Sequence, residues 1–468
     1  MKKNNLLTVI ILIIITVLSI QTGEACSTFM LKNGNELFYG HNLNQPGMNV
    51  PGLIFINKRG VFKVGRSSDE MLTKERSNPS TLSWISRYGS VTFSTFGKDM
   101  PDGGINEAGL YLWEMNDETQ YPVNDKLPKL IQMNWMQYIL DNFSTIDEAI
   151  QAAYDIEIGG WGWHYFVSDY TGKCASIEFI NGEVVIHKGE NMPVPGLFNE
   201  PYKKELNLLP YFKGFGGIYE PDLNNSKVPR FVKTAVMLRD YSPTQNAVDY
   251  GLKILKQLTV NEPPKWSVLI DARRKTIFFY TQLNPETKVF SYSNFDFSNN
   301  TPVQVLNMDI EEGKNVDNLF HNSTDNEINS FLNALPIPDG FFHKFGLTKV
   351  EFSDRFTNHY HASFDSTRHF FKGAWKVNTE ESGKQKNPFP YTFEIVANND
   401  IVSGFAIHTD GDRYKLDHLS MIGQLIKFTF ISSSGTMWQV MGNIEGDKMI
   451  VEFGAFDYYV GKFNFYKI

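Results

Sequence analysis

The stretch CSTFMLKNGNELFYGHNLN, residues 26–44, decides how this chain begins to fold. It reads as two largely apolar strands joined by Asn33-Gly34, and this dipeptide between apolar segments is a strong β-hairpin signal. Its first residue is Cys26, one of only two cysteines in 468 residues. The position of Cys26 directly behind an apolar leader is the feature on which the functional predictions depend.

The first 25 residues have the pattern of a secretory signal peptide. A pair of lysines gives a positive start, and the apolar run of residues 6–20 is shorter than the ~20 residues that cross a bilayer. Small residues, Gly23 and Ala25, stand where a signal peptidase inspects the chain. We therefore predict cleavage before Cys26 and export to the periplasm or the exterior; the alternative is that the leader is retained as an anchor.

Cleavage before Cys26 would place a thiol and a free α-amine on one residue. The reference pKa is about 8.5 for the thiol and about 7.7–8.0 for the amine, so near neutral pH the amine can accept the thiol proton. Nucleophile and general base are then supplied together, as in enzymes that activate a nucleophile with the N-terminal amine. Such a site also needs donors for the developing oxyanion and a cation that favours the thiolate.

Two other interpretations of Cys26 stay open. A lipoprotein signal would attach lipid and block the amine, but it normally has a leucine-like residue three positions upstream, where this chain has Gly23. A signal cut elsewhere would leave Cys26 internal. The second cysteine, Cys174, lies in a short apolar run typical of a buried strand, so we expect it to be a core residue rather than a disulfide partner.

The rest of the chain has a globular composition, 42% hydrophobic and 21% charged, and its length suggests two or three domains. A net charge of −8 argues against nucleic acid as the main partner. Residues 26–310 alternate between strand and helix patterns and predict a layered α+β domain. Polar residues 311–340 predict a linker, and short alternating runs in residues 341–468 predict a small antiparallel β-barrel (lipocalin-like) or sandwich. Helical spacing marks residues 127–153, with a cap expected at Ser144 or Thr145, and residues 230–241 and 244–258.

Five short segments, in the same order, resemble the choloylglycine hydrolase family. They are CSTFMLKNGNELFYGHNLN, DGGINEAGLYLWEMN, HYFVSDYTGK, GLFNEPYK and KVPRFVKTAVMLRDY. The family comprises N-terminal-nucleophile cysteine amidases, including bile salt hydrolases and penicillin V acylases. The resemblance runs discontinuously from Cys26 to about residue 300 and implies a four-layer αββα catalytic domain.

The resemblance also implies roles for individual residues. Cys26 would be the nucleophile, Asn116 and Asn199 take the positions of oxyanion-hole asparagines, and Arg230 takes that of the active-site arginine. The implied reaction is hydrolysis of a linear, non-peptide amide. The thiolate attacks the carbonyl, the α-amine protonates the leaving nitrogen, and water clears the acyl-enzyme. Taken without the family, each asparagine is more often a structural residue than a catalytic one.

Two site positions depart from the family pattern. His41 stands in place of an arginine, and Asn44 in place of an aspartate that normally contacts the α-amine. Histidine is charged only below about pH 6.5 unless perturbed, and asparagine can accept a hydrogen bond but carries no charge. We keep both as site residues and expect a pH dependence that differs from that of typical members. The alternative is that the activity has weakened or moved to another substrate.

The expected partner is a small amide with an apolar acyl group, on account of Trp84, Trp113, Trp161 and Trp163, although tryptophans are more often core residues. Conjugated bile salts, penicillin V, acyl-homoserine lactones and N-acyl lipids all stay open, as does a homo-oligomer. No cofactor is expected. His359 and His361 lack a clear third ligand and make a poor zinc site. Two other functions are weighed: acyl transfer to an amine, and a surface binding protein that has lost catalysis.

Overall fold

The computed structural model describes most of the chain from Cys26 onward. The described residues are 26–44, 52–74, 80, 82–259, 263–298, 301–336, 339–343, 345–356, 373–377, 390–398, 401–422, 425–445, 448–455 and 458–467. The predicted signal peptide, residues 1–25, lies outside them, and so do His359 and His361. Within the described part of the chain, no helix is both long and apolar enough to span a membrane.

A six-stranded antiparallel sheet begins directly after Cys26. Its order in space is β14 (Gly196–Leu197), β1 (Ser27–Asn33), β2 (Glu36–Leu43), β15 (Trp266–Asp271), β16 (Thr276–Thr281) and β17 (Lys288–Ser291). The turn between β1 and β2 is the predicted hairpin, in which Gly34 has a φ of +56°, a value that glycine adopts without strain. The register sets Thr28 opposite His41.

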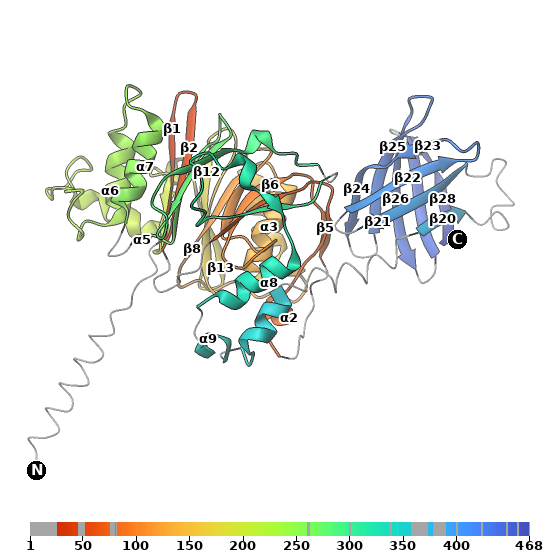
Figure 1. The fold of residues 1–468 in the computed structure, drawn as a ribbon, viewed down its shortest axis with the longest axis horizontal. Helices are drawn as coiled ribbons and strands as arrows, with labels where there is room; N and C mark the ends of the chain where they lie inside the picture. The colour runs from red at the N-terminus through yellow and green to blue at the C-terminus, as the bar shows by residue number, and fades with distance from the viewer. Residues whose placement is uncertain are drawn as a thin grey trace, which may run out of the picture.

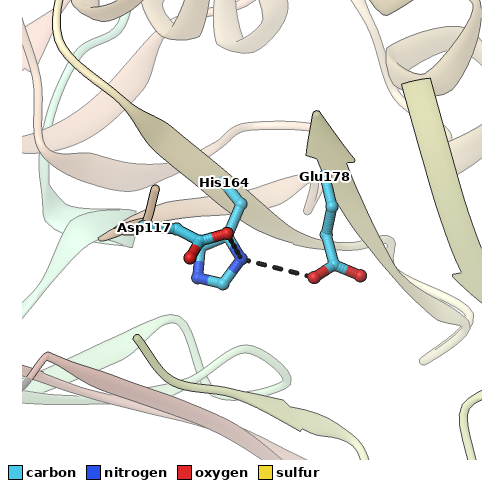
Figure 2. A group of neighbouring side chains, drawn as sticks. All are labelled: Asp117, His164 and Glu178. Carbon is cyan, nitrogen blue, oxygen red and sulfur yellow. Dashed lines mark ion pairs between the residues drawn. The ribbon is translucent and has the colours of Figure 1, made fainter. Parts of the chain in front are cut away.

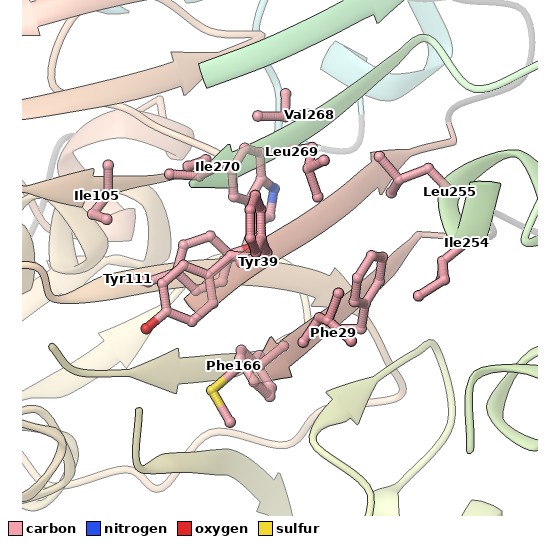
Figure 3. Packing of buried hydrophobic residues seen from close by; sticks show 14 of the residues in the cluster. Phe29, Tyr39, Ile105, Tyr111, Phe166, Ile254, Leu255, Val268, Leu269 and Ile270 are labelled. Atoms are coloured by element: carbon pink, nitrogen blue, oxygen red, sulfur yellow. The ribbon is translucent and has the colours of Figure 1, made fainter. Parts of the chain in front are cut away.

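A nine-stranded antiparallel sheet packs face to face against the first (Figure 1). Its order is β13 (Glu183–Lys188), β12 (Cys174–Ile180), β11 (Trp163–Ser168), β8 (Tyr111–Asn116), β7 (Gly103–Asn106), β6 (Ser90–Ser94), β3 (Leu53–Asn57), β18 (Gln304–Asn307) and β19 (His321–Asn322). Between the sheets, the rings of Tyr39 and Tyr111 stack with centroids 4.3 Å apart (Figure 3). The hydroxyl of Tyr111 also lies 2.9 Å from that of Thr28. Aromatic packing and one polar contact therefore join the two sheets.

Helices cover the outer faces of both sheets. α6 (Arg230–Arg239) and α7 (Ala247–Gln257) contact the first sheet, and α3 (Gln132–Asn142) and α4 (Ile146–Asp155) contact the second. The result is the predicted αββα layering. α4 begins with the expected cap: the Thr145 hydroxyl accepts from the backbone N–H of Glu148, whose carboxylate accepts in return from the Thr145 N–H.

Short elements complete this domain. They are β4 (Phe62–Val64), α2 (Ser68–Leu72), β5 (Ser83–Ile85), β9 (Lys129–Ile131), β10 (Glu157–Gly159), η1 (Gly189–Asn191), α5 (Tyr202–Leu206), η2 (Leu209–Tyr211), η3 (Tyr292–Asn294), η4 (Asp317–Leu319), α8 (Asp325–Ala334) and α9 (Asp339–His343).

The segment 311–340, which we expected to be a linker, carries secondary structure. β19 pairs with β18 of the large sheet, and α8 follows it. Ile328, Phe331 and Leu332 of α8 are buried in the same apolar cluster as residues of α3 and α4. Their i, i+3, i+4 spacing makes one face of α8 apolar, and the polar residues that suggested a linker occupy the rest of the helix.

The C-terminal region forms a nine-stranded antiparallel sheet that curls into a nearly closed barrel (Figure 1). Its order is β23 (Arg413–Lys415), β22 (Ile401–His408), β21 (Tyr391–Asn398), β20 (Gly373–Val377), β28 (Tyr458–Lys467), β27 (Lys448–Ala455), β26 (Met437–Glu445), β25 (Leu425–Ile431) and β24 (Asp417–Ile422). Phe393, Phe428 and Phe465 are buried in its interior, together with Trp375, and Trp438 packs against them. Of the barrel and the sandwich that the alternating sequence predicted, the structure has the nearly closed barrel.

Candidate active site

Cys26 lies immediately before β1 and is buried. It belongs to the apolar cluster that fills the space between the two sheets and extends beneath α6 and α7. Polar atoms nevertheless reach its backbone, because Arg230 donates to its carbonyl oxygen at 2.6 Å. The first residue of the predicted mature chain is thus fixed by a cation at its carbonyl end.

Arg230 is the first residue of α6, directly after Pro229, whose ring fixes φ and suits a helix start. Its Nη1 donates to the Cys26 carbonyl and, at 2.9 Å, to the hydroxyl of Ser27. Its Nη2 donates to Oδ1 of Asn199 at 3.0 Å. One planar guanidinium therefore connects the start of β1 with the segment that follows β14.

The two predicted oxyanion asparagines are themselves bonded. Nδ2 of Asn199 donates to the backbone carbonyl of Asn116 at 2.9 Å. Nε1 of Trp163 in turn donates to Oδ1 of Asn116 at 2.6 Å, which leaves Nδ2 as the end of the Asn116 amide that can donate. The structure thereby brings Cys26, Arg230, Asn199 and Asn116 into one continuous line of contacts, which we call the active-site line.

His41 is buried away from this line of hydrogen bonds. Its ring stacks on Trp113 with centroids 4.1 Å apart, and neither ring nitrogen has a hydrogen-bond partner among the described residues. Burial therefore lowers the pKa of His41 well below its usual value. His41 is neutral near pH 7 and does not replace the charge of the arginine that the family has there. Asn44, directly after β2, is also buried, and its role stays a prediction.

Glu205 is a neighbour of Arg230 that the sequence analysis missed. Burial raises the pKa of the Glu205 carboxyl to about 8, with the Arg230 charge acting in the opposite direction. Near neutral pH this carboxyl largely keeps its proton, so it does not cancel the charge of Arg230, which can favour a thiolate at Cys26. Glu205 lies three residues after the buried Tyr202, and this helical spacing was the signal for its burial.

The four tryptophans expected near the substrate and the second cysteine differ in how deeply they are buried. Trp84, Trp113 and Trp163 are buried core residues, whereas Trp161 is partly exposed. Cys174 is not paired with Cys26, since both are free thiols. Burial raises the pKa of Cys174 to about 12. A thiol of this kind is a poor nucleophile near neutral pH.

One group of side chains in the described part of the chain has the composition of a metal site. Ligand atoms of Asp117, His164 and Glu178 lie within 4.8 Å of one another (Figure 2). The Glu178 carboxylate already accepts from the backbone N–H of Tyr202 at 2.7 Å and lies 2.8 Å from Nδ1 of His187. The sequence analysis did not single out any of these residues, because they come from separate strands.

Comparison with known proteins finds a family that is similar to the first part of the described chain. Residues 26–202 match the model of the linear amide C-N hydrolases, choloylglycine hydrolase family. This segment is similar to that family, and the match begins at Cys26. It includes Asn116, Asn199 and the three side chains of Figure 2 but ends before Arg230.

Two penicillin V acylases are similar to parts of this chain, one in sequence and one in fold. The protein of Pectobacterium atrosepticum is 33% identical over 187 residues, which are 35% of this chain and 49% of that protein. This chain therefore spans about half the length of that curated relative. The solved structure of penicillin V acylase from Agrobacterium tumefaciens has a TM-score of 0.52 at 23% identity and covers 64% of this chain and 98% of its own. That likeness shows a shared fold. Conjugated bile acid hydrolase from Clostridium perfringens has a TM-score of 0.49 at 16% identity, over 62% of this chain and 98% of its own.

Proposed function

We propose that the mature protein is an exported linear amide hydrolase whose nucleophile is the thiol of Cys26, made N-terminal by removal of residues 1–25. The observation that carries the proposal is the active-site line, in which Arg230 joins the Cys26 carbonyl to Asn199, and Asn199 joins Asn116. This line starts at the residue where the family match begins.

In the first step, the α-amine of Cys26 takes the thiol proton and the sulfur attacks the amide carbonyl carbon. The C–S bond forms, and the carbonyl electron pair moves onto oxygen. The free donors for this oxyanion are Nδ2 of Asn116 and those N–H groups of Asn199 that the active-site line does not use. Arg230 favours the thiolate before the attack.

In the second step, the oxyanion re-forms the carbonyl and the C–N bond breaks. The leaving nitrogen takes the proton that the α-amine has held, which releases a neutral amine and leaves a thioester on Cys26. Water then attacks the thioester, the α-amine acts again as base, and the acid product leaves. The C–S bond breaks as the acid leaves, and the proton that the α-amine took from water restores the thiol, while the original thiol proton has left with the amine.

The substrate class that we propose is a small N-acyl amide with an apolar acyl group. The site adjoins an apolar cluster, and the Arg230 guanidinium lies over the ring of Phe198 with a centroid distance of 5.4 Å. Penicillin V and conjugated bile acids, the substrates named for the relatives, both present an amide next to an apolar body. They are the first compounds to test.

The test starts from the full chain, expressed with its leader and recovered after export. Intact mass identifies the first residue, and a panel of amides is assayed with the wild type and with Cys26→Ala. Alkylation by iodoacetamide, followed by peptide mapping, adds a readout without turnover: Cys26 should react faster than Cys174. Cys174 is an internal control, since burial raises the pKa of its thiol to about 12.

Each outcome separates the proposal from its rivals. A chain that begins at unmodified Cys26 and hydrolyses an amide, with activity lost in Cys26→Ala, supports the proposal. Aminolysis that outcompetes hydrolysis would indicate an acyltransferase. Ligand binding without turnover would indicate a binding protein, and lipid on Cys26 would remove the base and contradict the mechanism.

A further inference from the structure

A buried cluster of ionisable side chains lies directly behind the active-site line. His164 on β11 and Glu178 on β12 are fully buried, and Asp117 follows the last residue of β8. Nδ1 of His164 lies 3.5 Å from Oδ2 of Asp117 and 3.5 Å from Oε1 of Glu178 (Figure 2). The imidazole thus faces two carboxylates from two different parts of the sheet.

The other ring nitrogen of His164 faces the segment that carries Asn199. Nε2 lies 2.5 Å from the backbone carbonyl oxygen of Phe198, the residue before Asn199. A carbonyl oxygen can only accept, so Nε2 carries a proton and donates. Nδ1 faces the carboxylates of Asp117 and Glu178, 3.5 Å from each, and makes no hydrogen bond to another described residue. The ring therefore lies between two carboxylates and a peptide carbonyl to which Nε2 donates.

The cluster and the active-site line are covalent neighbours at three places: residues 116–117, 163–164 and 198–199. Asn116 belongs to the line and Asp117 to the cluster. Trp163 donates to the line, and His164 belongs to the cluster. Asn199 belongs to the line, and Phe198 faces His164 of the cluster. Asn199 and Trp163 both donate to Asn116, at 2.9 and 2.6 Å. Contacts of the His164 ring and of its chain neighbour Trp163 therefore lead to both asparagines.

We infer that His164 is a positioning residue of the active site: its Nε2–H fixes the Phe198–Asn199 peptide, and Asp117 and Glu178 fix the ring. The effect on kcat rests on the proposed function, in which Asn199 donates to the oxyanion. The anchoring of the Phe198–Asn199 peptide by His164 does not depend on that function. Glu178 also contacts His187 at 2.8 Å, but His187 lies on β13, on the other side of that carboxylate.

The decisive variants replace His164 with the two amides. In His164→Asn the amide nitrogen reaches only the place of Nδ1, so the donor to Phe198 is lost. In His164→Gln the amide nitrogen reaches the place of Nε2, so that donor is kept. We expect kcat to fall about tenfold or more in His164→Asn, with KM within about twofold, because misplacing one oxyanion donor weakens transition-state binding. We expect His164→Gln to regain most of this loss, and the matched control His187→Asn to stay near wild type.

Two readouts do not depend on turnover. In 15N-histidine NMR of the wild type, with His164→Gln to identify the signal, Nε2 of His164 should carry a proton. In crystal structures, the Phe198–Asn199 peptide should move in His164→Asn and stay in place in His164→Gln. If no amide is hydrolysed by the wild type, the proposed function fails, and these two readouts still decide the inference.

Several results would overturn the inference. One is a kcat of folded His164→Asn equal to that of the wild type, and another is an equal loss of kcat in His164→Asn and His164→Gln. The others are an Nε2 of His164 without a proton, and a Phe198–Asn199 peptide that does not move in His164→Asn. A stoichiometric divalent metal ion in the purified wild type, lost in Glu178→Gln, would replace it with a metal site. If both His164 variants fail to fold, Asp117→Asn tests the same ring from the rim of the cluster. It should lower kcat about threefold, and an unchanged kcat would contradict the inference.

Discussion

Arg230 holds Asn199 through a 3.0 Å hydrogen bond from Nη2 to Oδ1, and its other terminal nitrogen lies 2.6 Å from the Cys26 carbonyl oxygen. Because the guanidinium is planar, the directions of these two bonds are fixed relative to each other. The group that orients the predicted nucleophile residue is therefore the same group that orients a predicted oxyanion donor. We therefore expect the site to depend on this double contact more than on the positive charge alone.

Arg230→Lys should separate the charge from the double contact. Lysine keeps the charge but is a point donor, so it cannot hold Cys26 and Asn199 in the same geometry. We expect kcat to fall about a hundredfold, with a smaller change in KM, in amide hydrolysis assays. Arg239→Lys, at the exposed end of the same helix, is the matched control and should stay within about twofold. Activity near wild type in Arg230→Lys would show that the charge alone suffices.

Asn199→Ala tests the donor itself. Removal of one oxyanion donor typically lowers kcat by about 10²–10³-fold, and we expect a loss in this range. The variant also removes one hydrogen bond of the Arg230 guanidinium, so a small drop in thermal stability should accompany it. Asn207→Ala, at the exposed end of α5, controls for loss of an asparagine in the same segment. A fully active Asn199→Ala enzyme would remove Asn199 from the mechanism.

Glu205 should make stability fall as pH rises. Its pKa is about 8 in the folded protein, because of burial, against an ordinary value of 4.5. Between these values the folded protein binds a proton that the unfolded chain has released, so unfolding becomes easier as pH rises. The slope is at most about 1.4 kcal/mol per pH unit.

Glu205→Gln keeps the shape of the side chain and removes the titration. We expect its free energy of unfolding in urea to exceed that of the wild type at pH 8 and to approach it at pH 5. Glu190→Gln, which changes an exposed carboxylate, should show no such difference. Parallel stability curves for the wild type and Glu205→Gln would mean that Glu205 is ionised in the folded protein.

His41 should destabilise the folded protein in acid. Burial lowers the pKa of His41 in the folded protein well below 6.5. Below pH 6.5 the unfolded chain therefore binds a proton that the folded protein does not bind, which favours unfolding. His41→Phe keeps an aromatic ring on Trp113 and removes two buried nitrogens without partners among the described residues. We expect about 1 kcal/mol more stability at pH 7 and a larger gain at pH 5, measured in urea. A destabilised His41→Phe variant would show that the imidazole makes a polar contact.

Asn44→Asp should shift the pH–rate profile. A carboxylate near the α-amine of Cys26 would raise the pKa of that amine, so the free base needed for attack would form at higher pH. The acid limb of kcat/KM should therefore move to higher pH in the variant. Identical profiles would show that position 44 does not act on the amine.

The sequence by itself determined the local features, because their signals lie within a few residues of each other. Asn33-Gly34 predicted the β1–β2 turn, and a cap at Ser144 or Thr145 predicted the start of α4, where the structure has Thr145. Period-two alternation predicted a C-terminal barrel or sandwich. Five ordered motifs indicated the family and named Cys26, Asn116, Asn199 and Arg230 together. In the segment 311–340, composition favoured a linker, but three buried residues of α8 at helical spacing outweighed many exposed polar ones.

The tertiary structure alone decided which of these groups meet. Arg230 contacts Cys26 across 204 positions of sequence, and no local pattern encodes that distance. Burial is likewise a property of the packed molecule. It makes His41 neutral, keeps a proton on Glu205, and sets His164 between two carboxylates. Spacing along a chain specifies turns and the apolar faces of helices and strands. Sheet register specifies which side chains come into contact, and exclusion of water specifies which of them stay charged.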